Sequence, residues 1–125
     1  MNAAAETPPG ESPYGLDAAG ARSERHIAAH YAEVLADHDA LTQFRLIDVE
    51  RRLVAARQAL RHGTSDDGLL AALTEQQRAI DVEAARRRAH IQAWQRYTLE
   101  EFRRQRRRRS NTASVPSPPA RPDRA

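Results

Sequence analysis

A run of arginines near the end of the chain is the feature of the sequence that is best suited to do chemistry. Six of the seven residues from 103 to 109 are arginine. A guanidinium group stays charged at neutral pH, and its planar donors match the oxygens of phosphates and carboxylates. Several such groups together would bind phosphates tightly and in a salt-sensitive way. The candidate site residues are Arg103, Arg104, Arg106, Arg107, Arg108 and Arg109.

The letters of this run suggest the kind of partner. RRQRRRR, residues 103–109, resembles the arginine-rich RNA-binding peptides, such as that of the lentiviral transactivator Tat. The resemblance covers seven residues and has no implication for the fold. A basic-region zipper matches less well, because its basic helix precedes the coil and carries an Asn-centred pattern that reads bases. We therefore expect contacts to DNA or RNA phosphates that are largely independent of base sequence, or else contacts to another anionic surface.

A second group of arginines lies in ARRRAHIQAWQRY, residues 85–97. Arginines interleaved with aromatic rings can stack on bases as well as contact phosphates. Trp94 falls on the same helical face as Ile91, so we interpret it as a core residue and Tyr97 as the candidate for stacking. The members of this group, expected to assist binding, are Arg86, Arg87, Arg88 and Arg96.

Histidines are the other residues that could bind a ligand. His26 and His30 are four residues apart on one helical face, a spacing that can chelate zinc. No further histidine is expected near them, so we interpret them as a solvated flank and predict no metal and no cofactor. His38 falls on the apolar face, and we expect it to be half-buried. The carboxylates are scattered rather than convergent, so we predict that the protein is not an enzyme.

Composition limits the architecture. The chain has 125 residues, no cysteine, and only 21 Val, Ile, Leu and Phe residues, so any core must be thin. It contains no run apolar enough to span a membrane, and we expect a cytoplasmic protein. Residues 103–125 hold eight arginines and one acid, whereas residues 1–102 hold twelve arginines and sixteen acids. This asymmetry is typical of a basic end that contacts a polyanion.

Helix breakers divide the chain into five parts. All seven prolines lie outside residues 14–115, and Gly63 and Gly68 bound the only interior break. We predict a left-handed Gly63 at the end of the first helix, with Thr64 or Ser65 capping the second. The predicted parts are a disordered head (1–20), helix one (21–62), a turn (63–68), helix two (69–109) and a disordered tail (110–125).

Apolar spacing predicts how these helices pair. Both helices show steps of three and four residues, with a slip near Phe44 in the first. Arg87 interrupts the pattern of the second, and we expect it to reach toward Asp39 or the rim of the seam. In an antiparallel pair, facing residues should have numbers that add to about 130, as in Val49 with Ile80 or Ile27 with Phe102. The prediction is an all-α fold, a long antiparallel helical hairpin.

Two helices bury little area, so we expect self-association. A second stripe contains Ala28, Ala32, Ala36, Ala40, Ile47 and Val54 on helix one and Ala85, Ala89 and Ala93 on helix two. It would let two hairpins form a homodimeric four-helix bundle. Alternatively, alanine is simply a good helix former on exposed faces. The predicted function is non-enzymatic nucleic-acid binding, and the alternative is a protein-interaction or scaffold module whose basic end docks an acidic partner or aids solubility.

Overall fold

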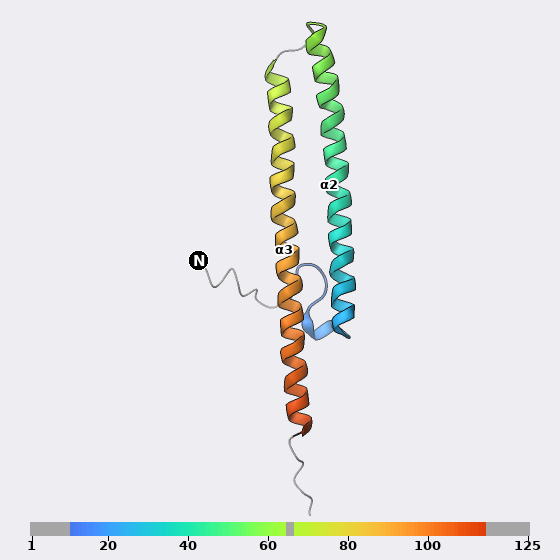
Figure 1. Cartoon of the computed structure of the whole chain (residues 1–125), viewed down its shortest axis with the longest axis vertical. Helices are drawn as coiled ribbons and strands as arrows, with labels where there is room; N and C mark the ends of the chain where they lie inside the picture. The colour runs from blue at the N-terminus through green and yellow to red at the C-terminus, as the bar shows by residue number, and fades with distance from the viewer. Residues whose placement is uncertain (1–10, 65–66, 115–125) are drawn as a thin grey trace, which may run out of the picture. The chain divides into compact units, whose positions relative to one another are not determined.

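The computed structural model describes residues 11–64 and 67–114, and it is helical almost throughout (Figure 1). A short 3-10 helix, η1 (Ala18–Gly20), precedes two long helices, α2 (Glu24–Arg61) and α3 (Asp67–Ser114). This confirms the predicted all-α helical hairpin. Helix α3 continues five residues past the predicted end at residue 109, so the arginine run is helical. Residues 1–10, 65–66 and 115–125, with the candidate cap Ser65, lie outside the described residues.

Helix α2 begins at a side-chain cap. The Ser23 hydroxyl accepts a hydrogen bond from the backbone N–H of His26 (3.0 Å), which otherwise has no partner in the first turn. In return, the His26 ring nitrogen Nδ1 accepts the backbone N–H of Arg22 (3.0 Å). These two bonds resemble a capping box and hold the start of α2, where Glu24 is the first helical residue.

Helix α2 ends in the left-handed glycine that the sequence predicts. Gly63 has φ 73°, its N–H donates to the Leu60 carbonyl (3.0 Å), and the Thr64 N–H donates to the Ala59 carbonyl (2.8 Å). This pair of bonds is a Schellman motif. The Thr64 hydroxyl also donates to the Ala59 carbonyl (3.0 Å), so Thr64 closes α2 rather than capping α3.

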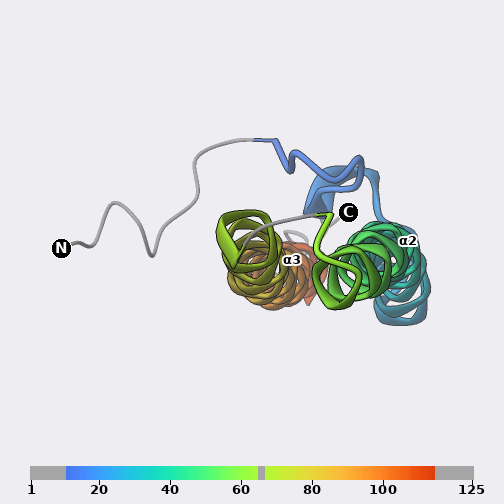
Figure 2. The ribbon, with the colours of Figure 1, turned by 90° about the horizontal axis from the view of Figure 1, so that it is seen from above.

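The chain divides into two compact units, and residues 31–93 form one of them. Its core cluster consists of Val49, Leu53, Ala56 and Leu73, with Leu70 and Ile80 partly buried against it. Across the two helices of this unit, which lie side by side in Figures 1 and 2, Glu50 meets Gln77 and Asp39 meets Arg88. The numbers of both pairs add to 127. The observed register therefore differs by about one helical turn from the predicted value of about 130.

Packing is loose in the middle of this unit. Leu41, predicted to lie in the apolar seam, is 54% exposed, and Thr42 is half-buried instead. The half-buried positions His38, Thr42 and Leu46 step by four residues, which is the slip expected near Phe44. A shallow pocket beside His38 marks the thin packing. Because the slip changes which face of α2 is turned inward, Thr42 occupies the half-buried position that was predicted for Leu41.

The other unit contains residues 1–30 and 94–125. Its buried side chains are Leu16, Ala18, Ile27, Trp94, Thr98 and Phe102. Residues 11–20 were expected to be disordered, but they follow a defined path, with Asp17 capping η1 through a hydrogen bond to the Gly20 N–H (3.1 Å). The segment is held because Leu16 and Ala18 are apolar enough to be buried, a signal too short to detect by periodicity.

Candidate nucleic-acid interface

The arginine run occupies one continuous stretch of α3. All six of its arginines are exposed, and Phe102, immediately before them, is the last buried residue of the helix within the described side chains. Successive residues turn a helix by about 100°, so these side chains point to all sides of α3. The predicted cluster therefore exists as a helical segment with charge around its whole circumference.

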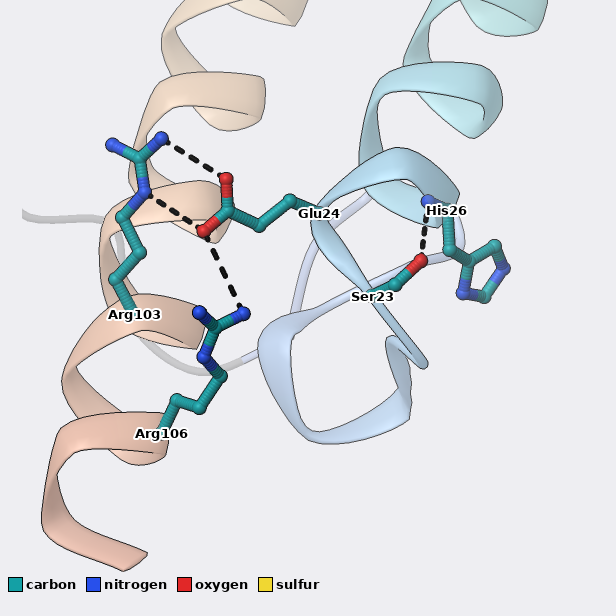
Figure 3. Close-up of polar contacts among 5 residues, drawn as sticks. All are labelled: Ser23, Glu24, His26, Arg103 and Arg106. Carbon is teal, nitrogen blue, oxygen red and sulfur yellow. Dashed lines mark hydrogen bonds and ion pairs between the residues drawn. The ribbon is translucent and has the colours of Figure 1, made fainter. Parts of the chain in front are cut away.

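Glu24 engages two members of this run (Figure 3). The Arg103 side chain donates to both carboxylate oxygens of Glu24, from Nε and Nη2, at 3.1 Å each. Arg106 Nη1 lies 3.9 Å from Glu24 Oε2. The first residue of α2 thus contacts two of the six arginines of the run. Guanidinium groups bind phosphates in the same bidentate geometry.

These contacts shift the pKa of Glu24. The hydrogen bond from Arg103, together with the charges of Arg103 and Arg106, lowers the pKa of Glu24 below its ordinary value. The same hydrogen bond raises the pKa of Arg103. Both side chains remain partly exposed, so solvent screens the pair and its contribution to stability is modest.

A second acid lies within α3 itself. Arg104 donates from Nε and Nη2 to Glu101 Oε1, at 3.0 and 2.6 Å, and this bond lowers the pKa of Glu101. In the part of the chain that the structure describes, Arg107, Arg108 and Arg109 have no ion pair within 4.0 Å. These three are the residues of the run most available to an external anion.

The upstream arginines divide between the two units. Arg96 belongs to the same unit as the run, and it lies on the side of α3 that also carries Arg103 and Arg107, opposite the buried Trp94 and Thr98. Trp94 is buried, as predicted, and Tyr97 is half-buried with its ring edge-on to Trp94 at 5.5 Å. Tyr97 is thus committed in part to packing, so little of its ring is available for stacking.

In the unit of residues 31–93, only one of the three upstream arginines has a partner in α2. Arg88 Nη1 lies 2.5 Å from Asp39 Oδ2. We expected Arg87 to reach toward Asp39 or the rim of the seam, and the partner of Asp39 is instead the next residue, Arg88. Arg86 and Arg87 are both exposed.

His26, His30 and His38 each make a hydrogen bond within the protein. His26 takes part in the cap of α2, and His30 Nε2 lies 2.5 Å from the Tyr14 carbonyl oxygen. His38 is half-buried, as predicted, and its Nε2 donates to the Ala84 carbonyl (3.1 Å). Across residues 11–64 and 67–114, no three histidine, aspartate or glutamate side chains gather closely enough to hold a metal ion.

Glu24 and Glu101 are the residues that sequence reasoning missed. Glu101 is three residues before Arg104, a spacing visible in the sequence. Glu24 lies near the start of the predicted helix one, and at the predicted sum of 130 it faces Arg106, which it approaches at 3.9 Å. Its hydrogen bonds go to Arg103, at a sum of 127. The predicted register therefore already placed an acid of helix one beside the run.

Known proteins add nothing to this site. No protein-family model matches the chain, and no curated protein or solved structure is significantly similar to it. Among the described residues, no helix is long and apolar enough to cross a membrane.

Proposed function

We propose that this protein binds nucleic acid without an enzymatic step, through the arginines of residues 103–109. The observation that carries the proposal is the helical, exposed placement of six arginines past the last buried residue of α3. Like charges so close together repel unless an anion neutralises them. A duplex or a folded RNA supplies phosphates at a density that a basic helix matches.

The contacts would go to phosphates rather than to base edges. The run is arginine on every side, with Gln105 as its only other residue, so it offers no distinct pattern of donors and acceptors for reading bases. Arg96, on the side of Arg103 and Arg107, would extend the contact along α3. Arg86, Arg87 and Arg88 are proposed as further phosphate contacts, with Arg88 first leaving Asp39.

The test is a fluorescence-anisotropy titration with duplex DNA, single-stranded DNA and hairpin RNA at two salt concentrations. The variant changes Arg107, Arg108 and Arg109 to Gln, which leaves the contacts to Glu24 and Glu101 in place. The matched control changes Arg45, Arg57 and Arg61 to Gln, the same loss of charge at exposed positions of α2. Circular dichroism checks that helicity is kept.

The proposal expects binding by the native protein and by the control, with a large loss in the tail variant. The slope of log K against log salt should become shallower by about 0.9 per lost phosphate contact on duplex DNA. Equal binding by variant and control would show that net charge alone acts. No binding by the native protein would overturn the proposal and leave the run as a solubilising helix end.

We also propose that the chain forms a homodimer, since Leu41, Phe44 and Ile47 remain exposed on α2. The same apolar side chains favour the second candidate function, a scaffold or protein-interaction module. That function predicts a protein partner whose capture survives loss of the arginines. The nucleic-acid proposal expects the reverse. A cytoplasmic location is part of the proposal for either function.

A further inference from the structure

A cluster of large apolar side chains on α2 has no cover in the described structure. Phe44 is 74% exposed, Leu41 54% and Ile47 48%. A single exposed leucine would need no explanation, but three large apolar residues within two helical turns are unusual in a chain with only two phenylalanines. We call these three residues the Phe44 cluster.

Helix geometry places the Phe44 cluster on the outer face of the unit of residues 31–93. With about 100° per residue, Phe44 points about 140–180° away from the buried Val49 and Leu53. Leu41 and Ile47 lie on either side of Phe44 on this outer face. The cluster is therefore separate from the core that joins α2 to α3.

The exposed charges on the same face of α2 change sign along the helix. Glu33 and Asp37, before Phe44, are acidic and exposed, and Arg51, after it, is basic and exposed. Among the described residues, these three make no ion pair within 4.0 Å. Asp37 and Arg51 are each seven residues from Phe44. The charges on this face are therefore complementary to those of a second copy of α2 that runs in the opposite direction.

We propose that the Phe44 cluster is the homodimer interface, formed by two α2 helices packed antiparallel around a two-fold axis at Phe44. In such an interface, residues equally far before and after the axis meet in the two copies. Leu41 then packs against the partner copy's residue 47, and Asp37 meets the partner copy's residue 51. A parallel arrangement would instead place like charges together, so the face selects the antiparallel one.

This interface differs from the stripe of alanines that the sequence suggests. Ala28, Ala32, Ala36 and Ala40 step by four, and each such step drifts about 40° around a helix. Over three steps these alanines spread by about 120°, and Ala40, the nearest of them, lies about 40° to one side of Phe44. The proposed interface is instead centred on Phe44, and it shares Ile47 with the predicted stripe.

The inference rests on the proposed homodimer, and analytical ultracentrifugation of the full chain separates the two. Sedimentation equilibrium is measured for the native protein, for Phe44→Glu and for the control Val82→Glu. Val82 is 50% exposed on α3 and away from the cluster, so the control adds the same charge to another apolar position. Phe44→Glu should weaken the dimer by about 30-fold or more, as expected of an interface hot spot.

Charge reversal tests the antiparallel pairing. Asp37→Arg alone and Arg51→Asp alone should each weaken the dimer, because each brings like charges together. The double variant should restore it, since the pair is reversed but still complementary. A merely structural defect would accumulate in the double variant instead of being rescued. Circular dichroism of every variant confirms that the helices form.

Each outcome assigns a failure to one proposal. A native protein that stays monomeric at micromolar concentration overturns both the homodimer and this interface, and leaves the Phe44 cluster to a different protein. A native dimer that Phe44→Glu leaves intact overturns the interface alone. A dimer lost in Phe44→Glu, kept in Val82→Glu and restored by the double charge reversal establishes the interface.

Discussion

Glu24 shows how a single residue can set the strength of a basic site. It binds Arg103 through two hydrogen bonds and lies near Arg106, so a phosphate must displace a carboxylate from both. The carboxylate is partly exposed, which makes exchange feasible. In the proposed binding of nucleic acid, Glu24 would therefore compete with phosphates for Arg103 and Arg106.

Replacing Glu24 with Gln should therefore raise the affinity for polyanions several-fold at low salt. The salt slope should steepen by up to about two phosphate contacts, as Arg103 and Arg106 become available. The measurement is the anisotropy titration used for the tail variants. Glu75→Gln is the matched control, because it removes a carboxylate paired with Arg78 on another part of α3. An equal rise in this control would reduce the effect to net charge.

The same pair predicts a dependence of stability on pH. The pKa of Glu24 is lower in the folded protein than its ordinary value of 4.5. The ionised carboxylate therefore stabilises the fold above about pH 4.5, and this contribution is lost as pH falls through the lowered folded value. Thermal unfolding of the native protein and of Glu24→Gln should differ at neutral pH and converge in strong acid. A difference that persists in acid would contradict the assignment.

At the scale of elements, the unit of residues 31–93 depends on a small cluster in which each side chain matters. Leu53 is 1% exposed and belongs to the cluster with Val49, Ala56 and Leu73. Few neighbours could collapse around a cavity there. The cluster, rather than helix propensity alone, keeps α2 and α3 paired in this unit.

Leu53→Ala should lower the free energy of unfolding by about 2–5 kcal/mol, the usual range for a buried leucine. Val82→Ala, at a position that is 50% exposed, should change it by no more than about 0.5 kcal/mol. Urea denaturation followed by circular dichroism measures both. Similar losses for the two variants would mean that Leu53 is not a core residue in solution.

At the scale of the whole molecule, charge and packing are distributed unevenly. The basic excess lies in residues 103–125, whereas residues 1–102 carry a net negative charge. In the unit of residues 31–93, the buried cluster includes Val49, Leu53 and Ala56, but no α2 residue from 32 to 48 is fully buried. Stability within one helix is therefore expected to vary along its length.

Hydrogen exchange should reveal this variation. In Phe44→Glu, which removes the proposed dimer contact, amides of residues 34–46 should exchange faster than those of residues 49–56. Native protein at high concentration should show added protection around Phe44. Mass spectrometry of peptides from both samples makes the comparison. Uniform protection along α2 would show that the middle is packed as well as the end.

The sequence by itself determined the two helices, the glycine that ends α2 and the basic segment. Breaker placement and apolar steps of three and four specify local structure, so Gly63, the buried Trp94 and the half-buried His38 could all be predicted. The exposure of the arginines also followed from the sequence, because no apolar position comes after Phe102 in the predicted seam. These features depend on neighbours in the chain.

Only the tertiary structure decided the register, and with it the partners of the charged residues. Apolar patterns that repeat every three and four residues pack almost equally well after a shift of one turn, so periodicity cannot tell 127 from 130. In the observed register, Asp39 pairs with Arg88 and Glu24 pairs with Arg103. The bonds of His30 and Asp17 in residues 11–30 were also hidden, because contacts of irregular segments leave no periodic signal.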